Sequence, residues 1–403
     1  MQTDQTIQVE VWNSFEDLQT IQAEWDKFVE SVGGEIFLTY DWCRIWWKYY
    51  GNNRDLRVFI FRSNGKLVGI IPLFFERIWL GLISVCAAKI VGSDFTISHF
   101  SLPILRSCTA SVSNRFAELL SKSMCDVICI GPLAGLYKGY NDLIETLKQS
   151  VERSHAVFGV DIGVHTYYRM AQTWEEYLAG LRKKERQLIR NAYRRIERGE
   201  LTLISELASI NNFKEKFDGF VRTHQSHWQS IGKAGHFGDW PLSVEFHREV
   251  ARAQLEHGRL RLLEVRLSEA CSGYQYSYRF GDTYLSVLPA RPAEINSTKI
   301  PTGKVLFSEQ LKNAIDEKIT YIDSMQAKYE YKLRLGGELL SMRAIYVCRK
   351  GILAAPRIFM FRVLSKLLDI CYFKIWYCRI APMLPFKRRP LWRIWIRSNA
   401  FAE

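Results

Sequence analysis

The fold is decided by residues 284–335, which read YLSVLPARPAEINSTKIPTGKVLFSEQLKNAIDEKITYIDSMQAKYEYKLRL. The apolar start of this stretch is interrupted at Pro289, and a loop then leads to Pro301-Thr302-Gly303-Lys304. Apolar spacing predicts a helix over 303–318, whose buried stripe contains Leu306, Gln310 or Leu311, and Ile315. A short strand, Ile319–Met325, comes next. The stretch therefore predicts a strand, a loop, a helix and a second strand, in that order.

The start of the predicted helix 303–318 is typical of an anion site. Pro and Gly at a helix start leave backbone N–H groups free at the positive end of the helix dipole. Lys304 adds a positive charge to these donors. An ordinary Pro-Gly helix start has the same spacing, so the residues alone leave both interpretations open.

Two predicted hairpins look like copies of one another. Leu56–Arg62 and Leu67–Phe75 are joined through Asn64-Gly65, which favours a type I′ turn. Leu260–Leu267 and Ser272–Arg279 form the second pair, and a third strand, Thr283–Leu288, follows. A shift of 204 residues aligns Leu56 with Leu260, Arg57 with Arg261, Arg62 with Arg266 and Gly69 with Gly273. Chance can produce this match, but two α+β units divided near residue 170 also fit the length of 403 residues.

Helical patterns lie between the hairpins. Phe37–Tyr50 is predicted to be an aromatic helix with Asp41 as its N-cap. Arg182–Arg198 is strongly basic, and Leu188, Ala192 and Ile196 share one of its faces. Its charged side is either a solvated surface or a surface for an anionic substrate. Asn212–Trp228 is predicted to be a further helix.

The positive charge is concentrated in a C-terminal tail. The net charge is +13, yet residues 341–403 alone hold thirteen Lys or Arg and two acids. The body is therefore nearly neutral, and nucleic-acid binding loses most of its support. Apolar and aromatic residues alternate with the charges of the tail, which is typical of a helix on a membrane surface. A helix packed on the body is the alternative.

Composition and missing motifs exclude several classes of protein. The ordinary apolar and charged fractions exclude a disordered chain. Nine Cys without a Cys-x-x-Cys pair give no support for a paired-thiol zinc site or a disulfide framework. His224 and His227 lack further ligands at metal spacing, so we expect no metal. The start of the chain lacks the features of a signal peptide, and we expect a cytoplasmic protein.

Taken together, the motifs resemble one enzyme family. The carriers, in order, are Phe37-x4-Trp42-x3-Trp46-Trp47, Gly69-x2-Pro72-Leu73, the basic helix 182–198, His224-x3-Trp228-x3-Gly232 with Phe237, Pro301-x-Gly303, and Asp323 followed by Tyr331-Lys332. This chain resembles the CelD/BcsL-type GNAT acetyltransferases of cellulose and exopolysaccharide synthesis, relatives of the FemAB aminoacyltransferases. It departs from them at Thr302 in the loop and at Ala327, where the family has Pro and Gly.

The resemblance implies an α+β fold of tandem GNAT domains with mixed sheets flanked by helices. We expect a degenerate N-terminal GNAT-like domain at 1–170, a GNAT domain with the acyl-CoA loop at 171–345, and a basic amphipathic tail at 346–403. The implied co-substrate is acetyl-CoA or another acyl-CoA, with Thr302, Gly303 and Lys304 in its binding loop.

Acyl transfer requires an oxyanion donor, a base and an acid. The resemblance places the oxyanion donor near Val287 and Leu288, where Pro289 interrupts strand pairing. Asp323 or His224 is expected as the base and Tyr331 as the acid. Lys332 would orient an anionic group. A strand-end carboxylate bound to a turn is the structural alternative for Asp323.

Together these features predict an acyl-CoA-dependent transferase that acts on a cell-envelope or exopolysaccharide precursor. We expect its tail to hold it at the inner membrane. One alternative is FemAB-like transfer of an aminoacyl group from charged tRNA, using helix 182–198. The other is a non-catalytic, membrane-associated partner of polysaccharide synthesis.

Overall fold

The computed structural model describes residues 7–93, 98–231, 235–239, 241–268, 270–292, 301–326, 328–380 and 383–384. Gly232 and Ala327, which enter the family resemblance, and the tail from Pro385 onward lie outside these residues. The chain forms two compact units, here called unit 1 and unit 2. Of the described residues, unit 1 contains 7–163 and 341–376, and unit 2 contains 164–340 and 377–384. The expected domain ranges, 1–170, 171–345 and 346–403, stay predictions.

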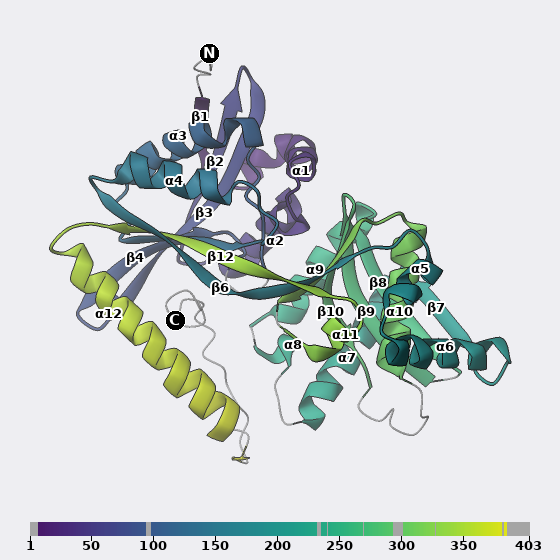
Figure 1. Ribbon diagram of the computed structural model, residues 1–403. Coiled ribbons are helices and arrows are strands. Elements are labelled where there is room, and N and C mark those ends of the chain that lie inside the picture. The colour runs from purple at the N-terminus through teal and green to yellow at the C-terminus, as the bar shows by residue number, and fades with distance from the viewer. Residues whose placement is uncertain are drawn as a thin grey trace. The chain divides into compact units, whose positions relative to one another are not determined.

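Unit 1 is a mixed sheet with helices packed against it (Figure 1). Its strands are β1 (Ile7–Trp12), β2 (Asp55–Ser63), β3 (Lys66–Leu80), β4 (Ile83–Ile90), β5 (Val127–Leu133), the first part of β6 (His155–Arg169) and most of β12 (Glu338–Arg349). The order is β1-β2-β3-β4-β5-β12, with β6 next, and β4 and β5 are parallel. Its helices are α1 (Gln22–Ser31), α2 (Tyr40–Tyr50), α3 (Thr109–Ser121), α4 (Tyr140–Val151) and α12 (Ala354–Leu367), with 3-10 turns at Glu16–Ile21, Ile36–Leu38 and Arg106–Cys108.

Helix α2 starts later than its sequence predicts. The segment before it forms a 3-10 turn, and Thr39 takes the N-cap position with extended backbone. Asp41 is not the cap. It lies in the first turn, where its carboxylate accepts a hydrogen bond from Gln22 Nε2 at 2.9 Å. Trp42 and Trp46 on this helix are fully buried, so the aromatic stripe is core.

The strands of unit 2 follow the order β6-β11-β10-β9-β8-β7 and are also mixed in direction, since β10 and β11 are parallel. Its strands, besides the second part of β6, are β7 (Leu203–Leu207), β8 (Leu260–Leu267), β9 (Ala270–Phe280), β10 (Thr283–Ala290) and β11 (Tyr321–Gln326). Its helices are α5 (Trp174–Gly180), α6 (Lys183–Glu197), α7 (Phe213–Ser230), α8 (His236–Asp239), α9 (Ser243–Glu256), α10 (Thr302–Asp316) and α11 (Glu330–Arg334). The predicted strand, loop, helix and strand of 284–335 are β10, the loop, α10 and β11.

Helices cover both faces of the unit 2 sheet. Alternate side chains of a strand point to opposite faces, and β9 shows this directly. The ring of Tyr276 lies 5.1 Å from that of Phe220 on α7. On the other face, Ser277 Oγ accepts a hydrogen bond from Gln310 Nε2 of α10 at 2.7 Å. Helix α10 therefore packs on this face of the sheet, and α6 contacts both α10 and β8.

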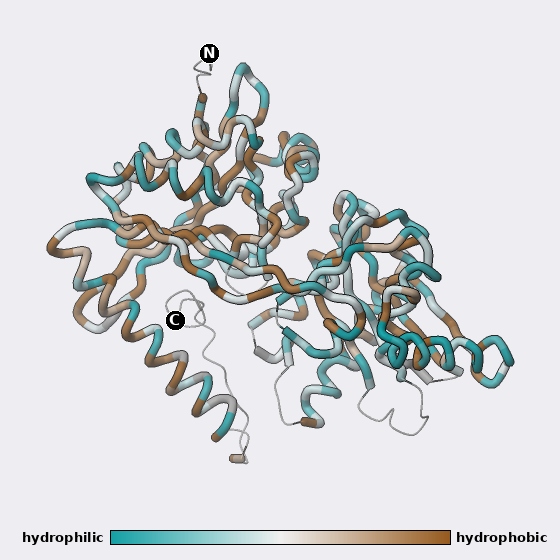
Figure 2. The backbone as a smooth tube through the Cα atoms, in the orientation of Figure 1, coloured by the Kyte–Doolittle hydropathy of each residue, from teal (hydrophilic) through white to brown (hydrophobic). Residues whose placement is uncertain are grey.

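The buried face of α6 is rotated from the predicted one. It runs through Glu185, Ile189 and Ala192, whereas Leu188 and Ile196 are only partly buried. The rest of the helix is strongly hydrophilic (Figure 2). Its basic side chains thus lie mostly on an exposed surface, as both interpretations of this helix require.

The two predicted hairpins share one register. In the first, Phe61 pairs with Gly69 and a bulge lies between Phe61 and Arg62. In the second, Val265 pairs with Gly273 and the bulge lies between Val265 and Arg266. Each of these positions is related to its counterpart by the shift of 204 residues seen in the sequence. Because a bulge is a specific local feature, the shared position strengthens the inference of duplication. The Asn64-Gly65 turn has positive φ at both residues, as predicted.

Residues 346–349 of the expected tail belong to β12, and the described residues that follow form helix α12 and a π-helix, Leu368–Ile380. The predicted helical character of this segment is therefore present as far as the structure describes it. Among the described helices, none combines the length and the apolarity needed to cross a bilayer.

Candidate active site

The parallel strands β10 and β11 separate after a short paired stretch. Their register ends at Leu285 opposite Asp323. Beyond this point β10 carries a bulge against β9, because Ser286 and Leu288 have partners there and Val287 does not. The predicted site of irregular pairing near Val287 and Leu288 is therefore a bulge at the point where the two strands diverge. Backbone groups released from a ladder in this way are available to a ligand.

A cavity of about 730 Å³ lies at this divergence, entirely within unit 2. Its wall is formed by the end of β10, the end of β11, the start of α10, one side of α7 and the short helix α11. The sequence-predicted residues that line it are His224, Val287, Leu288, Thr302, Gly303, Lys304, Tyr331 and Lys332. Asp323 does not line it. The fold thus brings together eight of the nine residues that sequence reasoning selected.

Helix α10 begins at Thr302 and directs its first turn at the cavity. Lys304 is less available to an anion than the sequence suggests, because its ammonium is paired with the carboxylate of Glu185 on α6. Glu185 is buried and also lines the cavity. An ion pair of this kind fixes α6 against the start of α10 and offsets the positive charge that Lys304 contributes.

Arg291 is the cation at this helix start that sequence reasoning missed. A Cβ added to Gly303 would lie only 2.6 Å from Arg291 Nη1, so the guanidinium group rests on the glycine. Arg291 is exposed and lines the cavity. The signal in the sequence was weak: Arg291 follows Pro289 by two residues, at the start of a long loop. The absence of a side chain at Gly303 leaves room for this guanidinium beside the free N–H groups of α10.

Lys332 is buried and bridges the irregular end of β11. Its ammonium donates to the carbonyl of Ser324 at 2.5 Å and to that of Gln326 at 3.5 Å. Met325, between them, has a left-handed backbone with φ of 60°. Burial lowers the pKa of Lys332 to about 8, although the nearby Asp323 carboxylate opposes the shift. Lys332 therefore holds the strand end in place and carries a proton that is easier to release than in water.

Tyr331 and Tyr329 stand at the cavity as a stacked pair. Their ring centroids are 5.9 Å apart, and both rings are about half exposed. Loss of water around the hydroxyl raises the pKa of Tyr331, and the positive charge of Arg291 works against this shift. Tyr331 therefore keeps its proton at neutral pH and lines the cavity.

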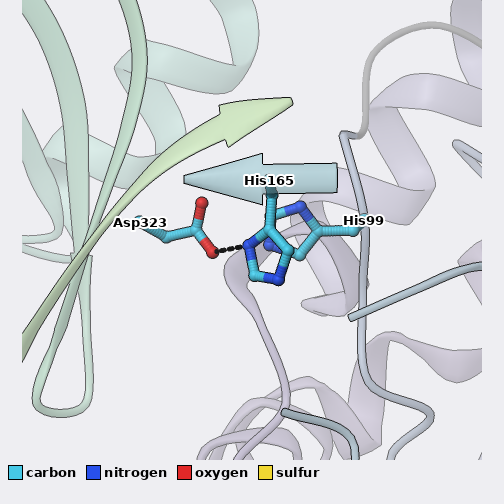
Figure 3. Close-up of side chains that lie close together, drawn as sticks. All are labelled: His99, His165 and Asp323. Atoms are coloured by element: carbon cyan, nitrogen blue, oxygen red, sulfur yellow. Dashed lines mark hydrogen bonds and ion pairs between the residues drawn. The ribbon is translucent and has the colours of Figure 1, made fainter. Parts of the chain in front are cut away.

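Asp323 does not line the cavity, and its carboxylate is directed at His165 (Figure 3). Its carboxylate is 2.7 Å from His165 Nδ1 on β6 and accepts a hydrogen bond from the Met325 N–H at 2.8 Å. Both side chains of the His165–Asp323 pair are buried. The carboxylate is thus engaged at a strand end and turn, as in the structural alternative considered from the sequence.

His224 lines the cavity but is poorly suited to accept a proton. Its Nε2 accepts a hydrogen bond from Trp228 Nε1 at 3.0 Å. Burial lowers the pKa of His224 to about 3, so the ring is neutral near pH 7. His227, one turn further along α7, also lines the cavity and is only partly buried. Among the described residues, none hydrogen-bonds to its Nδ1.

Charges around the cavity favour an anionic ligand. Arg291, Lys304, Lys332 and Arg334 line it, against the single carboxylate of Glu185. Low-dielectric walls strengthen the field that such side chains create. The chemistry of the lining therefore suits a ligand that carries phosphate or carboxylate groups.

In unit 1 the corresponding opening is filled by the chain itself. Strands β4 and β5 are also parallel over three residue pairs. Further along, the segment that contains Phe100 runs parallel to β5, where the Phe100 N–H donates to the Pro132 carbonyl and the Ala134 N–H to the Phe100 carbonyl, each at 2.9 Å. Phe100 is fully buried. Of the two similar units, only unit 2 has its opening free in the described residues.

Comparisons with known proteins agree with this architecture. No curated protein sequence matches the chain. The crystal structure of FemX superposes with a TM-score of 0.58 at 12% identity, covering 80% of this chain and 95% of FemX. Two more distant matches are L-PGS from Bacillus licheniformis and a tandem GNAT protein from the clavulanic acid biosynthesis pathway. L-PGS gives a TM-score of 0.46 at 12% identity, with 84% and 95% covered, and the tandem GNAT protein gives 0.43 at 12%, with 85% and 99% covered.

Residues 183–350 match the family model of the acetyltransferase (GNAT) domain. This range contains every residue that lines the cavity. Together with the mixed sheets flanked by helices and the repeated hairpin, the match confirms the expected α+β fold class. The chain has a GNAT-type acyltransferase fold with an acetyltransferase (GNAT) domain over 183–350.

Proposed function

We propose that this protein transfers an acetyl or other acyl group from acyl-CoA to an amine or hydroxyl of a cell-envelope or exopolysaccharide precursor. The observation that carries the proposal is the juxtaposition of the α10 start with the bulged end of β10 in one cavity. An acyl-CoA carries phosphates and a thioester. The start of α10 would donate hydrogen bonds to the phosphates, and the bulged end of β10 would donate to the thioester carbonyl.

The start of α10 is the proposed phosphate site. The N–H groups of Lys304 and Val305 donate to the Pro301 carbonyl, so those of Thr302 and Gly303, two residues that line the cavity, are the proposed donors, and Gly303 allows close approach of a phosphate to the backbone. Arg291 supplies the mobile positive charge in this proposal, since Lys304 is neutralised by Glu185. The residues present therefore fit a phosphate-bearing co-substrate.

The bulged end of β10 is the proposed oxyanion site. In acyl transfer the acceptor attacks the thioester carbonyl, a bond from carbon to the acceptor atom forms, and the bond from carbon to sulfur breaks. A backbone N–H at Val287 or Leu288 would stabilise the charge on the carbonyl oxygen. Tyr331 would give its proton to the departing thiolate, and the tyrosine would regain one from solvent.

The base that takes the proton of the acceptor is proposed to be a side chain of α7. His227 is favoured over His224, because the Nε2 of His224 already accepts a hydrogen bond and its pKa is low. Asp323, engaged with His165 and the Met325 N–H, is assigned a positioning role beside Lys332. Lys332 in turn holds the end of β11 through two backbone carbonyls.

FemAB-like transfer from charged tRNA remains the alternative activity, and two observations favour it. The fold match to FemX is the first, and the exposed basic surface of α6 is the second. A non-catalytic partner of polysaccharide synthesis is the third possibility. As for location, we propose a cytoplasmic protein held at the inner membrane by its tail.

Isothermal titration of the full chain with acetyl-CoA separates these functions. The acyl-CoA proposal expects saturable binding with a stoichiometry of one per chain, since only unit 2 has its opening free in the described residues. Desulfo-CoA, which keeps the phosphates, should compete for the same site. Absence of binding by either compound would leave the tRNA-dependent and non-catalytic functions. Transfer of label from acetyl-CoA to envelope precursors would then identify the acceptor.

A further inference from the structure

Among the described residues, helix α12 packs on unit 1 through one face. Ala354, Ile358, Phe361 and Ser365, spaced by three or four residues, are buried, and the helix lies against β4. This spacing defines a single stripe along the helix. Removing the tail would expose the part of unit 1 that this stripe covers. The function of the other side of the helix is therefore better tested by substitutions than by truncation.

The opposite face of α12 is apolar and exposed. Phe359, Val363 and Leu367 are four residues apart and form a second stripe, with Met360 beside them, and Phe359 is 67% exposed. We call Phe359, Met360, Val363 and Leu367 the outer face of α12. In the π-helix that follows, Ile370, Ile375 and Trp376 are also exposed. A contiguous apolar surface of this kind on a folded protein marks a binding surface.

Basic side chains border the outer face. Arg362 and Lys366, both exposed, follow the apolar stripe along one side, and Arg357 lies on the other, 3.9 Å from Asp126. The segment 354–380 holds five basic residues and one acid, Asp369. Brown and teal therefore alternate along α12 (Figure 2). An apolar stripe edged by positive charge is complementary to the acyl chains and anionic headgroups of a bilayer.

We propose that the outer face of α12 docks on the surface of an anionic lipid bilayer. The helix would lie in the plane of the interface, with its apolar stripe below the headgroups and Arg362 and Lys366 among the phosphates. Charge complementarity favours lipid over a protein partner, because the edge of the stripe is basic on both sides. This docking is independent of the chemistry proposed for unit 2.

Vesicle flotation of the full chain tests the proposal. We expect binding to vesicles that contain phosphatidylglycerol at low salt, much weaker binding to pure phosphatidylcholine vesicles, and a partial loss at high salt. The triple variant F359S/V363S/L367S should lower the partition coefficient more than tenfold. Lys366→Glu should lower it about tenfold or more, since each basic residue contributes about a factor of five.

Matched controls lie elsewhere on unit 1. Leu136→Ser changes an exposed leucine, and Lys122→Glu reverses an exposed lysine at the end of α3. Both should bind vesicles like the unchanged protein, and all variants should keep its melting temperature. The proposal is overturned if the full chain ignores phosphatidylglycerol vesicles, binds neutral vesicles equally, or keeps its binding in the triple variant. It is also overturned if light scattering shows a dimer that the triple variant abolishes while no vesicle binding exists.

Discussion

Replacing Gly303 by aspartate tests whether the start of α10 binds the phosphates of the co-substrate. The new Cβ would meet Arg291 Nη1 at 2.6 Å, and this far end of a flexible side chain can move aside. The backbone conformation is helical, and an acid in the first turn of a helix is stabilising by about 0.3–1 kcal/mol. We therefore expect the variant to fold and to melt at or above the temperature of the unchanged protein.

The loss of affinity follows from one added negative charge at the anion site. Two unit charges 4 Å apart repel by about 1 kcal/mol in water and by about 4 kcal/mol at an effective dielectric constant of about 20. The α10 start lies at the wall of a cavity, between these limits, so about 2 kcal/mol is a reasonable value. This corresponds to roughly a thirtyfold increase in the Kd of acetyl-CoA. An aspartate that pairs with Arg291 would add to the loss by removing a ligand of the phosphates.

Gly303→Asn is the matched control, because asparagine fills the same space without the charge. Titration calorimetry should give a Kd for the asparagine variant much closer to that of the unchanged protein than to that of the aspartate variant. Differential scanning fluorimetry checks the fold of both. If a folded Gly303→Asp protein binds acetyl-CoA with unchanged affinity, the α10 start is not the phosphate site. If Asn and Asp weaken binding equally, space rather than charge is responsible, and the electrostatic reasoning is wrong.

Other predictions concern the acid, the base and the pH dependence of stability. Tyr331→Phe should lower turnover by about 10²–10⁴ while the Kd of acetyl-CoA stays nearly constant, and full activity would show that the hydroxyl is not the acid. Lys332→Ala should also lower turnover without weakening acetyl-CoA binding, and it should lower the melting temperature, because two carbonyls of β11 lose their donor. His227→Ala should lower turnover far more than His224→Asn, and the reverse order would restore His224 as the base. Because burial holds the pKa of His224 near 3 in the folded protein, the unfolded chain binds the proton more readily between about pH 3 and 6.5. The free energy of unfolding should therefore fall as the pH is lowered through this window, and it should fall less steeply in the His224→Asn variant. Urea unfolding at a series of pH values measures both, and an equal dependence on pH in the two proteins would contradict this.

Local chemistry explains what could be predicted from the sequence. The Asn64-Gly65 turn and the Pro301-Thr302-Gly303 helix start depend on residues adjacent in the chain, and both are present. Long-range pairs were not accessible in the same way. The partner of Lys304 lies 119 residues away in Glu185, and that of Asp323 lies 158 residues away in His165. The sequence therefore predicted eight of the residues that line the cavity. It did not predict that the Lys304 ammonium and the Asp323 carboxylate are engaged by Glu185 and His165, which makes them less available to a ligand.

The two units show how one repeated hairpin gives one open site. Their hairpins share strand register and bulge, so the difference arises after the strand that follows each hairpin, which is β4 in unit 1 and β10 in unit 2. In unit 1 the segment after β4 runs parallel to β5, where the Phe100 N–H donates to the Pro132 carbonyl and the Phe100 carbonyl accepts from the Ala134 N–H. In unit 2, β10 stays paired with β9 as far as Ala290, one residue past Pro289, whose nitrogen carries no hydrogen to donate, and after residue 292 the described chain resumes at the N-cap of α10. The segment that follows β4 or β10, rather than the sheet itself, thus determines which unit can accept a ligand.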